Sequence, residues 1–129
     1  MQIDPDHGFD AAMGFRAIES GPDRVVLSWD VTEANQQPYG IVHGGAYCGA
    51  VESAASRGAA LWLGDRGKVV GVSNSTDFLR AAGEGRMTAT ATPIHRGRSQ
   101  QLWVVEIVDA QERLVARGQV RLQNLTDPG

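Results

Sequence analysis

The sequence predicts an α+β fold in which an antiparallel sheet wraps around one long helix. One segment, residues 44–63, is long, rich in alanine and free of proline, which is typical of a buried helix. Four β-rich runs follow it and are separated by loops of a few residues, which indicates antiparallel strands. Strands in succession with a single segregated helix are typical of the α+β class.

Two shorter strands are expected before the helix. Residues 15–19 form a short mixed run, and Gly21-Pro22-Asp23 marks a turn. Residues 24–31 are rich in β-branched side chains that alternate with polar ones, which indicates a strand. Residues 33–40 are polar and predict a loop, whereas the first dozen residues show little pattern.

The helix is nonpolar over most of its surface. Its charged residues before Asp65 are only Glu52 and Arg57, and Gly64 and Gly67 predict where it ends. The strands expected after it are residues 69–81, 86–95, 101–108 and 114–125. The short loops between them predict that each of these strands forms a hairpin with the next.

Composition limits the classes of function. A chain of 129 residues predicts one domain, with a core over about residues 14–125, and the net charge of −3 argues against nucleic-acid binding. Cys48 is the only cysteine, and the three histidines lack metal-ligand spacing, so we expect neither a disulfide nor a metal site. No apolar run is long enough to span a membrane, and residues 1–6 are acidic and unlike a signal peptide, which predicts a cytoplasmic protein.

Glu52 is the most informative single residue. Its neighbours three and four positions away on a helix are all small, and none is basic. Because burying an unpaired carboxylate costs several kcal/mol, Glu52 faces either solvent or a cavity that something else fills.

His43-Gly44-Gly45 stands at the expected start of the helix. The first N–H groups of a helix lack internal acceptors and could donate to a developing oxyanion, although an ordinary glycine-rich helix entry with a structural histidine would look the same. Gly44 and Glu52 are about 12 Å apart along one helix. If both act on one substrate, they come from different subunits, and the enzyme is a dimer with two shared sites.

These residues resemble a known family. Residues 37–45, with Glu52 and Ser56 after them, are similar to the hotdog-fold acyl-CoA thioesterases of the 4-hydroxybenzoyl-CoA type. They are also similar to the 1,4-dihydroxy-2-naphthoyl-CoA and phenylacetic-acid-pathway thioesterases, and the likeness continues in residues 69–80 and 93–98. It covers about residues 14–125 and implies a hotdog fold whose dimers join their sheets and often pair into tetramers.

The resemblance implies a role for each motif residue in hydrolysing an aryl- or medium-chain acyl-CoA. The Gly44 N–H would polarise the thioester carbonyl, and Gln37 and His43 would orient or polarise the same group. Glu52 of the partner chain would attack the carbonyl or activate a water molecule, which Ser56 would hold. No cofactor is implied, because coenzyme A is part of the substrate.

The resemblance also implies that coenzyme A binds near the loop that contains His95, Gly97, Arg98 and Ser99. Arg98 is the candidate for a phosphate contact, since a guanidinium suits phosphate, but it could equally be a solvated turn residue.

Three positions depart from the family pattern. Asp77 stands where asparagine is frequent, which could alter hydrogen bonds at the interface or pocket. Tyr47 and Cys48 replace small aliphatic residues and could reshape the acyl pocket, and Cys48 is expected to be inert.

Large apolar residues leave the pocket open to two interpretations. Tyr47, Trp62, Phe78 and Leu79 could shape an aromatic pocket or belong to the core.

A protein that binds acyl-CoA or assists assembly without catalysis is the main alternative function. A hydratase on the same fold would need an Asp-then-His catalytic pair, and it is disfavoured because His43 precedes Glu52 and no Asp stands in that role.

Overall fold

The computed structural model of the protein describes residues 7–126, so the acidic segment 1–6 discussed above lies outside the described residues. The expected helix is confirmed as α2, with the predicted bounds Gly44–Leu63. The strands are β1 (Arg16–Ser20), β2 (Val25–Asp30), β3 (Gly67–Phe78), β4 (Arg86–Arg96), β5 (Gln100–Val108) and β6 (Leu114–Thr126). Short helical turns are α1 (Gly8–Met13), η1 (Glu33–Asn35) and η2 (Gly64–Arg66).

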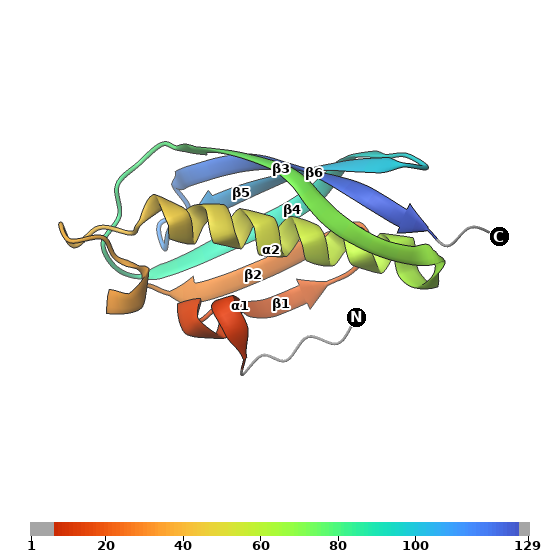
Figure 1. Ribbon diagram of the computed structural model, residues 1–129. Helices are drawn as coiled ribbons and strands as arrows, with labels where there is room; N and C mark the ends of the chain where they lie inside the picture. The colour runs from red at the N-terminus through yellow and green to blue at the C-terminus, as the bar shows by residue number, and fades with distance from the viewer. Residues whose placement is uncertain (1–6, 127–129) are drawn as a thin grey trace.

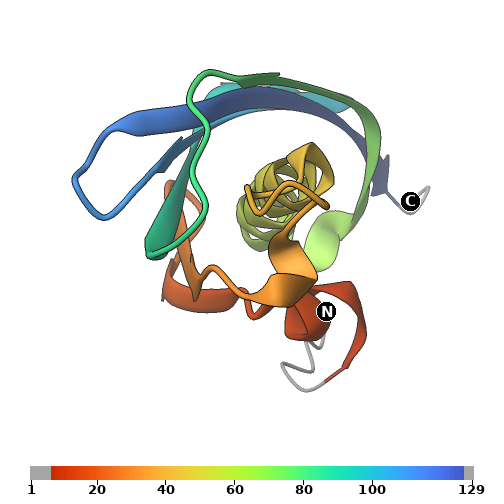
Figure 2. The ribbon, with the colours of Figure 1, turned by 90° about the vertical axis from the view of Figure 1, so that its left-hand side faces the viewer.

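The six strands form one antiparallel sheet in the order β1-β2-β4-β5-β6-β3. The sheet curves around α2, which lies along its concave face (Figure 1), and the end-on view shows the helix enclosed by the sheet (Figure 2). The predicted α+β class with an antiparallel sheet around a central helix is therefore confirmed.

One expected hairpin is wrong. β3 does not pair with β4 but with β6, while β4 lies between β2 and β5. The connection over residues 79–85 crosses the open end of the sheet instead of turning back beside β3. Its backbone accepts hydrogen bonds from the segment before the helix, from Val42 N to Ala82 O at 2.8 Å and from Gln36 Nε2 to Gly83 O at 2.8 Å. These contacts fix the crossing segment beside the start of α2.

Small side chains allow the sheet to approach the helix closely. Ala50, Ala54 and Ala59 on α2 are fully buried. At Gly58, a Cβ atom would lie 2.6 Å from the buried Trp103 ring, so the absence of a side chain makes this packing possible. Nine of the twenty α2 residues are buried and only Gly45 and Leu61 are exposed, which agrees with the predicted buried helix.

The first described residues contain a helix that the sequence did not predict. In α1, Phe9 packs against α2 at Gly49, and Asp10 accepts a hydrogen bond of 2.6 Å from Ser53 Oγ. A helix of six residues is too short to show a clear hydrophobic period, so tertiary contacts with α2 stabilise it. None of the helices within residues 7–126 has the length and apolar character needed to cross a membrane.

β3 forms an exposed edge of the sheet. It pairs only with β6, and most of its twelve residues are exposed, including Val70 and Val72. A long edge strand presents unpaired backbone N–H and C=O groups that can pair with a strand of another chain.

Candidate active site

The start of α2 presents a backbone N–H group without an acceptor. His43 is the N-cap, and its Nδ1 accepts a hydrogen bond of 2.7 Å from Gly45 N. Ala46 N donates to His43 O at 2.9 Å. Within residues 7–126, no acceptor is found for Gly44 N–H, so this donor is available at the positive end of the helix dipole. In a neutral His43 ring, accepting at Nδ1 places the proton on Nε2.

The Phe78 ring packs closely against Gly44. A Cβ atom at Gly44 would lie 2.7 Å from the Phe78 ring, which is closer than real carbon atoms approach. The ring therefore lies directly over the start of α2 while remaining 55% exposed. β3 ends at Phe78, so the end of the edge strand and the start of the helix meet here.

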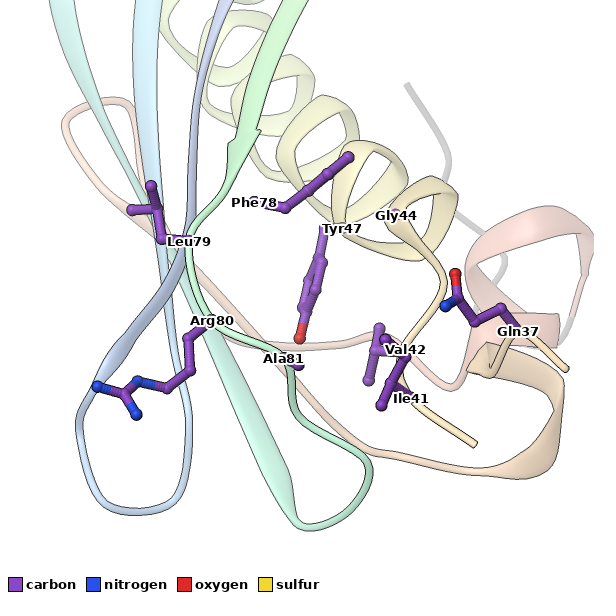
Figure 3. Close-up of a pocket in the computed structure, with 9 residues that line it drawn as sticks. All are labelled: Gln37, Ile41, Val42, Gly44, Tyr47, Phe78, Leu79, Arg80 and Ala81. Carbon is purple, nitrogen blue, oxygen red and sulfur yellow. The ribbon is translucent and has the colours of Figure 1, made fainter. Parts of the chain in front are cut away.

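A cavity of about 340 Å³ opens beside this helix start. Gln37 and Gly44 line it, and the residues that share the rest of its wall are Ile41, Val42, Tyr47, Phe78, Leu79, Arg80 and Ala81. Figure 3 shows these side chains arranged around the opening, with the Tyr47 ring running down its middle. The structure thus brings together Gln37, Gly44 and three of the four candidate aromatic and apolar pocket residues.

Trp62, the fourth of those candidates, does not belong to this cavity. It lies near the C-terminal end of α2 and lines a second hollow there. A helix of 20 residues extends about 30 Å, which keeps Trp62 far from the helix start.

The Glu52 carboxylate lies against the inner side of β3. Oε1 accepts a hydrogen bond of 3.1 Å from Asn74 Nδ2, and Ser56 Oγ lies 3.5 Å from Oε2. At Gly71, a Cβ atom would collide with Oε2, so glycine leaves the space that the carboxylate occupies. Glu52 is half-buried and forms no ion pair among the described residues. The carboxylate is therefore only partly shielded from water, and no cation lies beside it within residues 7–126.

Glu52 and Gly44 do not meet within one chain. Both lie on the straight run of α2, and eight residues correspond to about 12 Å along the helix axis. Sequence reasoning predicted this separation, but it missed Gly71 and Asn74, which lie on β3 and contact Glu52 only after folding.

The predicted coenzyme A loop contributes to the second hollow, whose volume is about 310 Å³. Gly97 and Arg98 line this hollow, whereas His95 and Ser99 are exposed and lie outside its lining. The other lining residues are Trp62, Leu63, Arg66, Arg96, Asn124 and Thr126. Sequence reasoning missed Arg66 and Arg96, although both are cations close to the helix end or the loop.

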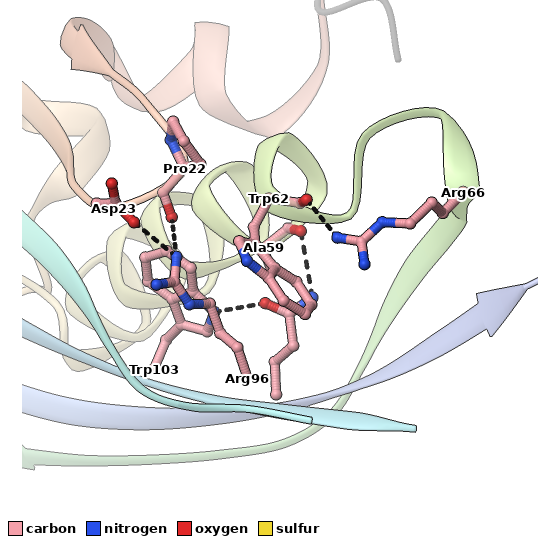
Figure 4. A network of polar contacts seen from close by, with 8 residues as sticks. Pro22, Asp23, Ala59, Trp62, Arg66, Arg96 and Trp103 are labelled. Atoms are coloured by element: carbon pink, nitrogen blue, oxygen red, sulfur yellow. Dashed lines mark hydrogen bonds and ion pairs between the residues drawn. The ribbon is translucent and has the colours of Figure 1, made fainter. Parts of the chain in front are cut away.

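The cations around this hollow differ in how they are paired (Figure 4). Arg96 donates to Asp23 Oδ1 and to Pro22 O, each at 2.8 Å. Arg66 lies 4.4 Å from the centre of the Trp62 ring and donates to the Trp62 carbonyl at 2.7 Å. Arg98 forms no ion pair within the described part of the chain.

Buried amides fix the loop that carries Arg98. Asn124 Nδ2 donates to Gly97 O at 3.0 Å and to Arg98 O at 3.2 Å. Gln101 joins this amide to the helix, since its Nε2 donates to Asn124 Oδ1 at 2.9 Å and to Ala59 O at 3.2 Å. The hollow therefore has a rigid wall on the side of the loop.

The positions that depart from the family pattern have different environments. Tyr47 is buried in the wall of the first cavity, and Cys48 is half-buried, with its carbonyl accepting from Asn74 Nδ2 at 3.1 Å. Asp77 is exposed on β3 and lies opposite Arg117 of β6, outside the cavity lining. No cluster of three or more potential metal ligands occurs in residues 7–126.

An antiparallel six-stranded sheet curved around one long central helix is the hotdog fold. The sequence profile of the Thioesterase superfamily matches residues 39–116, and this chain belongs to that family. It is a thioester hydrolase.

Three relatives illustrate the relationship. The chain is 34% identical to the 1,4-dihydroxy-2-naphthoyl-CoA hydrolase of Listeria monocytogenes over 108 residues, covering 84% of this chain and 88% of the relative. A solved protein from Mycobacterium tuberculosis has 50% identity and a TM-score of 0.90, covering 93% of this chain and 98% of the other. A solved thioesterase from Haemophilus influenzae has 28% identity and a TM-score of 0.86, covering 90% of this chain and 81% of the other.

Proposed function

We propose that the protein hydrolyses an aryl- or medium-chain acyl-CoA at a site shared by two copies of the chain, with a cytoplasmic location. Glu52 of one copy is the nucleophile or general base, and the Gly44 N–H of the other stabilises the oxyanion. One observation carries this proposal. Glu52 and Gly44 lie about 12 Å apart on α2, yet each contacts the same exposed strand, at Gly71 and at Phe78 respectively.

Pairing of two β3 strands would bring these groups together. In an antiparallel pair of identical strands, the early part of one strand lies opposite the late part of the other. A two-fold axis through Ser75, which places this residue opposite its own copy, would bring Phe78 of one copy beside the irregular stretch of β3 at Gly71 of the second. Glu52 of one copy would then approach the Gly44 N–H of the other. The pairing of such dimers into tetramers is part of the same proposal.

The chemistry follows from these two groups. The Gly44 N–H donates a hydrogen bond to the carbonyl oxygen as negative charge develops there and a tetrahedral centre forms, and one such donor lowers the barrier by about 3 kcal/mol. Glu52 either attacks the carbonyl carbon and forms an anhydride, which water then cleaves, or removes a proton from the attacking water. Both routes consume one water molecule and release a carboxylic acid and the coenzyme A thiol.

Gln37, His43 and Ser56 would assist these steps. Gln37 lines the cavity beside Gly44, and its side chain can donate to the thioester carbonyl. His43 fixes the geometry of the helix start through its bond with Gly45 N. Ser56 lies one turn beyond Glu52 and is placed to hold a water molecule near Oε2.

The second hollow is the proposed site for the coenzyme A phosphates. Arg98 is not committed to a carboxylate in the described structure, and a guanidinium binds phosphate oxygens in a bidentate manner. Arg66 supplies a second positive charge on the same hollow. His95 and Ser99 would contact the coenzyme from outside the lining.

Substitution of Glu52 tests the function directly. Purified wild-type protein should hydrolyse several members of a panel of aryl- and alkyl-acyl-CoA esters, with thiol release followed spectrophotometrically. Glu52→Ala and Glu52→Gln should each lose at least about a hundredfold in kcat. The exposed Glu106 provides the control, because Glu106→Gln should retain the wild-type rate. Binding without turnover by the wild type would instead indicate a non-catalytic acyl-CoA protein.

A pair of double variants isolates the Gly44 N–H. Proline is well suited to the first position of a helix and has no N–H, but its ring would collide with Phe78. In a Phe78→Ala background, Gly44→Pro removes the donor, whereas Gly44→Ala retains it and occupies similar space. The proline variant should have a kcat at least about a hundredfold below that of the alanine variant. Equal rates would contradict the role of this N–H.

A further inference from the structure

The Tyr47 hydroxyl has no role in the reaction described above. The residue is 3% exposed, and its hydroxyl oxygen has no hydrogen-bond partner among residues 7–126. Buried hydroxyl groups are nearly always paired in folded proteins, so an unpaired one calls for an explanation.

Tyr47 belongs to the wall of the cavity at the start of α2. Figure 3 shows the Tyr47 ring between the two sides of this cavity, with its oxygen directed toward Ala81 and away from the helix. Tyr47 is one turn beyond Gly44 on the same face of α2, so a group held at the Gly44 N–H can extend toward the phenol.

The surrounding wall is mostly hydrocarbon. Ile41, Val42, Leu79 and Ala81 line the cavity near Tyr47, and Phe78 lies beside it with a ring-to-ring distance of 6.1 Å. Such a wall suits the apolar body of an acyl group, and one phenol within it would select for a polar atom at a defined point.

The phenol stays a donor across the physiological range. Burial raises the pKa of Tyr47 above its usual value, and the negative charge of Asp109 raises this pKa further. A neutral phenol can donate its proton to an ether, hydroxyl or carbonyl oxygen of a ligand.

We propose that Tyr47 is a specificity-determining residue whose hydroxyl donates a hydrogen bond to an oxygen substituent on the acyl group. The enzyme therefore prefers acyl groups that carry this oxygen over matched groups that carry a methyl in its place. This inference rests on the proposed function, because the acyl group must occupy the cavity beside Gly44.

Paired substrates test the inference. The probes are 2-, 3- and 4-hydroxybenzoyl-CoA and the corresponding 2-, 3- and 4-methylbenzoyl-CoA, and the readout is the ratio of kcat/KM within each pair. For at least one ring position the wild type should prefer the hydroxyl ester by about tenfold or more, since a site with a buried donor rejects a ligand that leaves it unpaired. Tyr47→Phe should lower that ratio by about tenfold. Tyr39→Phe is the control, because Tyr39 is 88% exposed and outside the cavity lining, and the ratio should not change.

The outcomes separate this inference from the proposed function. Hydrolysis of both members of each pair with equal kcat/KM, unchanged in Tyr47→Phe, would overturn the role of Tyr47 while leaving the thioesterase assignment intact. Hydrolysis of no ester in the panel would count against the proposed function itself.

Stability provides a second readout. The Tyr47 hydroxyl has no partner in the described part of the protein, so its removal costs no hydrogen bond. Tyr47→Phe should therefore have a Tm equal to or above that of the wild type. A clearly lower Tm would show that the protein itself satisfies this hydroxyl and would also overturn the inference.

Discussion

Asn74 Nδ2 lies 3.1 Å from Glu52 Oε1 and 3.1 Å from the Cys48 carbonyl oxygen, so one amide joins the edge strand to two successive turns of α2. The amide is itself held by Thr76, whose Oγ1 donates to Asn74 Oδ1 at 2.7 Å. The orientation of the proposed catalytic carboxylate therefore depends on β3, the strand that we propose pairs with a second copy.

Loss of this amide should reduce the rate of reaction more than substrate binding. Asn74→Ala removes the donor that fixes Glu52, and we expect kcat to fall by about tenfold with little change in KM. Steady-state kinetics with an acyl-CoA substrate measures both constants. Thr76→Val keeps the Asn74 amide but removes the hydrogen bond that orients it, so kcat should fall by less than in Asn74→Ala. An unchanged kcat in Asn74→Ala would show that Glu52 needs no support from β3.

Gly71→Ala should displace the Glu52 carboxylate without unfolding the protein. The new Cβ would occupy the position of Oε2, and a flexible glutamate can move away at small cost to stability. We expect kcat to fall by at least about tenfold while Tm changes little. Gly21→Ala is a matched control, since its Cβ would make an ordinary contact of 3.6 Å with Arg24 O. Equal rates for the two variants would contradict the proposed position of the carboxylate.

Arg98→Ala should affect only substrates that carry the nucleotide phosphates of coenzyme A. We expect KM for an acyl-CoA to rise by about tenfold, whereas KM for the matching acyl-pantetheine should not change. The exposed Arg117 serves as the control, because it lies on β6 outside the lining of the second hollow. A similar rise for both substrates would place Arg98 near the acyl or pantetheine portion instead.

Asp109 should make stability depend on pH in the acid range. Burial raises the pKa of Asp109, but hydrogen bonds from Arg113 and Gln111 and the positive charge of Arg113 outweigh it and leave the pKa below its ordinary value of 3.8. The stabilisation is therefore complete above the pKa of the unfolded chain and is lost as pH falls through the lower folded pKa.

Chemical denaturation of Asp109→Asn at several pH values measures this effect. The variant should be less stable than the wild type near neutral pH, and the difference should shrink toward about pH 2. Asp30→Asn is the control, since Asp30 forms only an exposed ion pair with Arg86 and its substitution should have little effect. A difference that stays constant with pH would show that the charge of Asp109 does not stabilise the fold.

The sequence predicted the helix well because its determinants are local. Residues 44–63 form a long apolar, alanine-rich segment that glycine ends, and these features act within a few turns. The separation of Gly44 from Glu52 follows from helix geometry alone, so it too could be derived without coordinates.

The pairing of β3 could not be derived in the same way. Loop length favoured a hairpin between β3 and β4, but contacts between the crossing segment and Gln36 and Val42 direct the chain past the helix start. Gly71 and Asn74 were missed for a related reason, because their significance depends on a carboxylate from α2 that becomes their neighbour only in the folded chain.

The most direct test of a shared site mixes two inactive forms. Glu52→Ala is combined with the Gly44→Pro, Phe78→Ala double variant, the two are refolded together in equal amounts, and thioesterase activity is measured. If Glu52 and Gly44 act across the interface, activity should return to roughly a quarter of the wild-type rate, because half of randomly formed dimers are hybrids, and each hybrid has one intact site of two, in which Gly44 and its Phe78 both come from the Glu52→Ala copy. If the mixture stays as inactive as its components while hybrids are shown to form, the two residues do not act together across subunits.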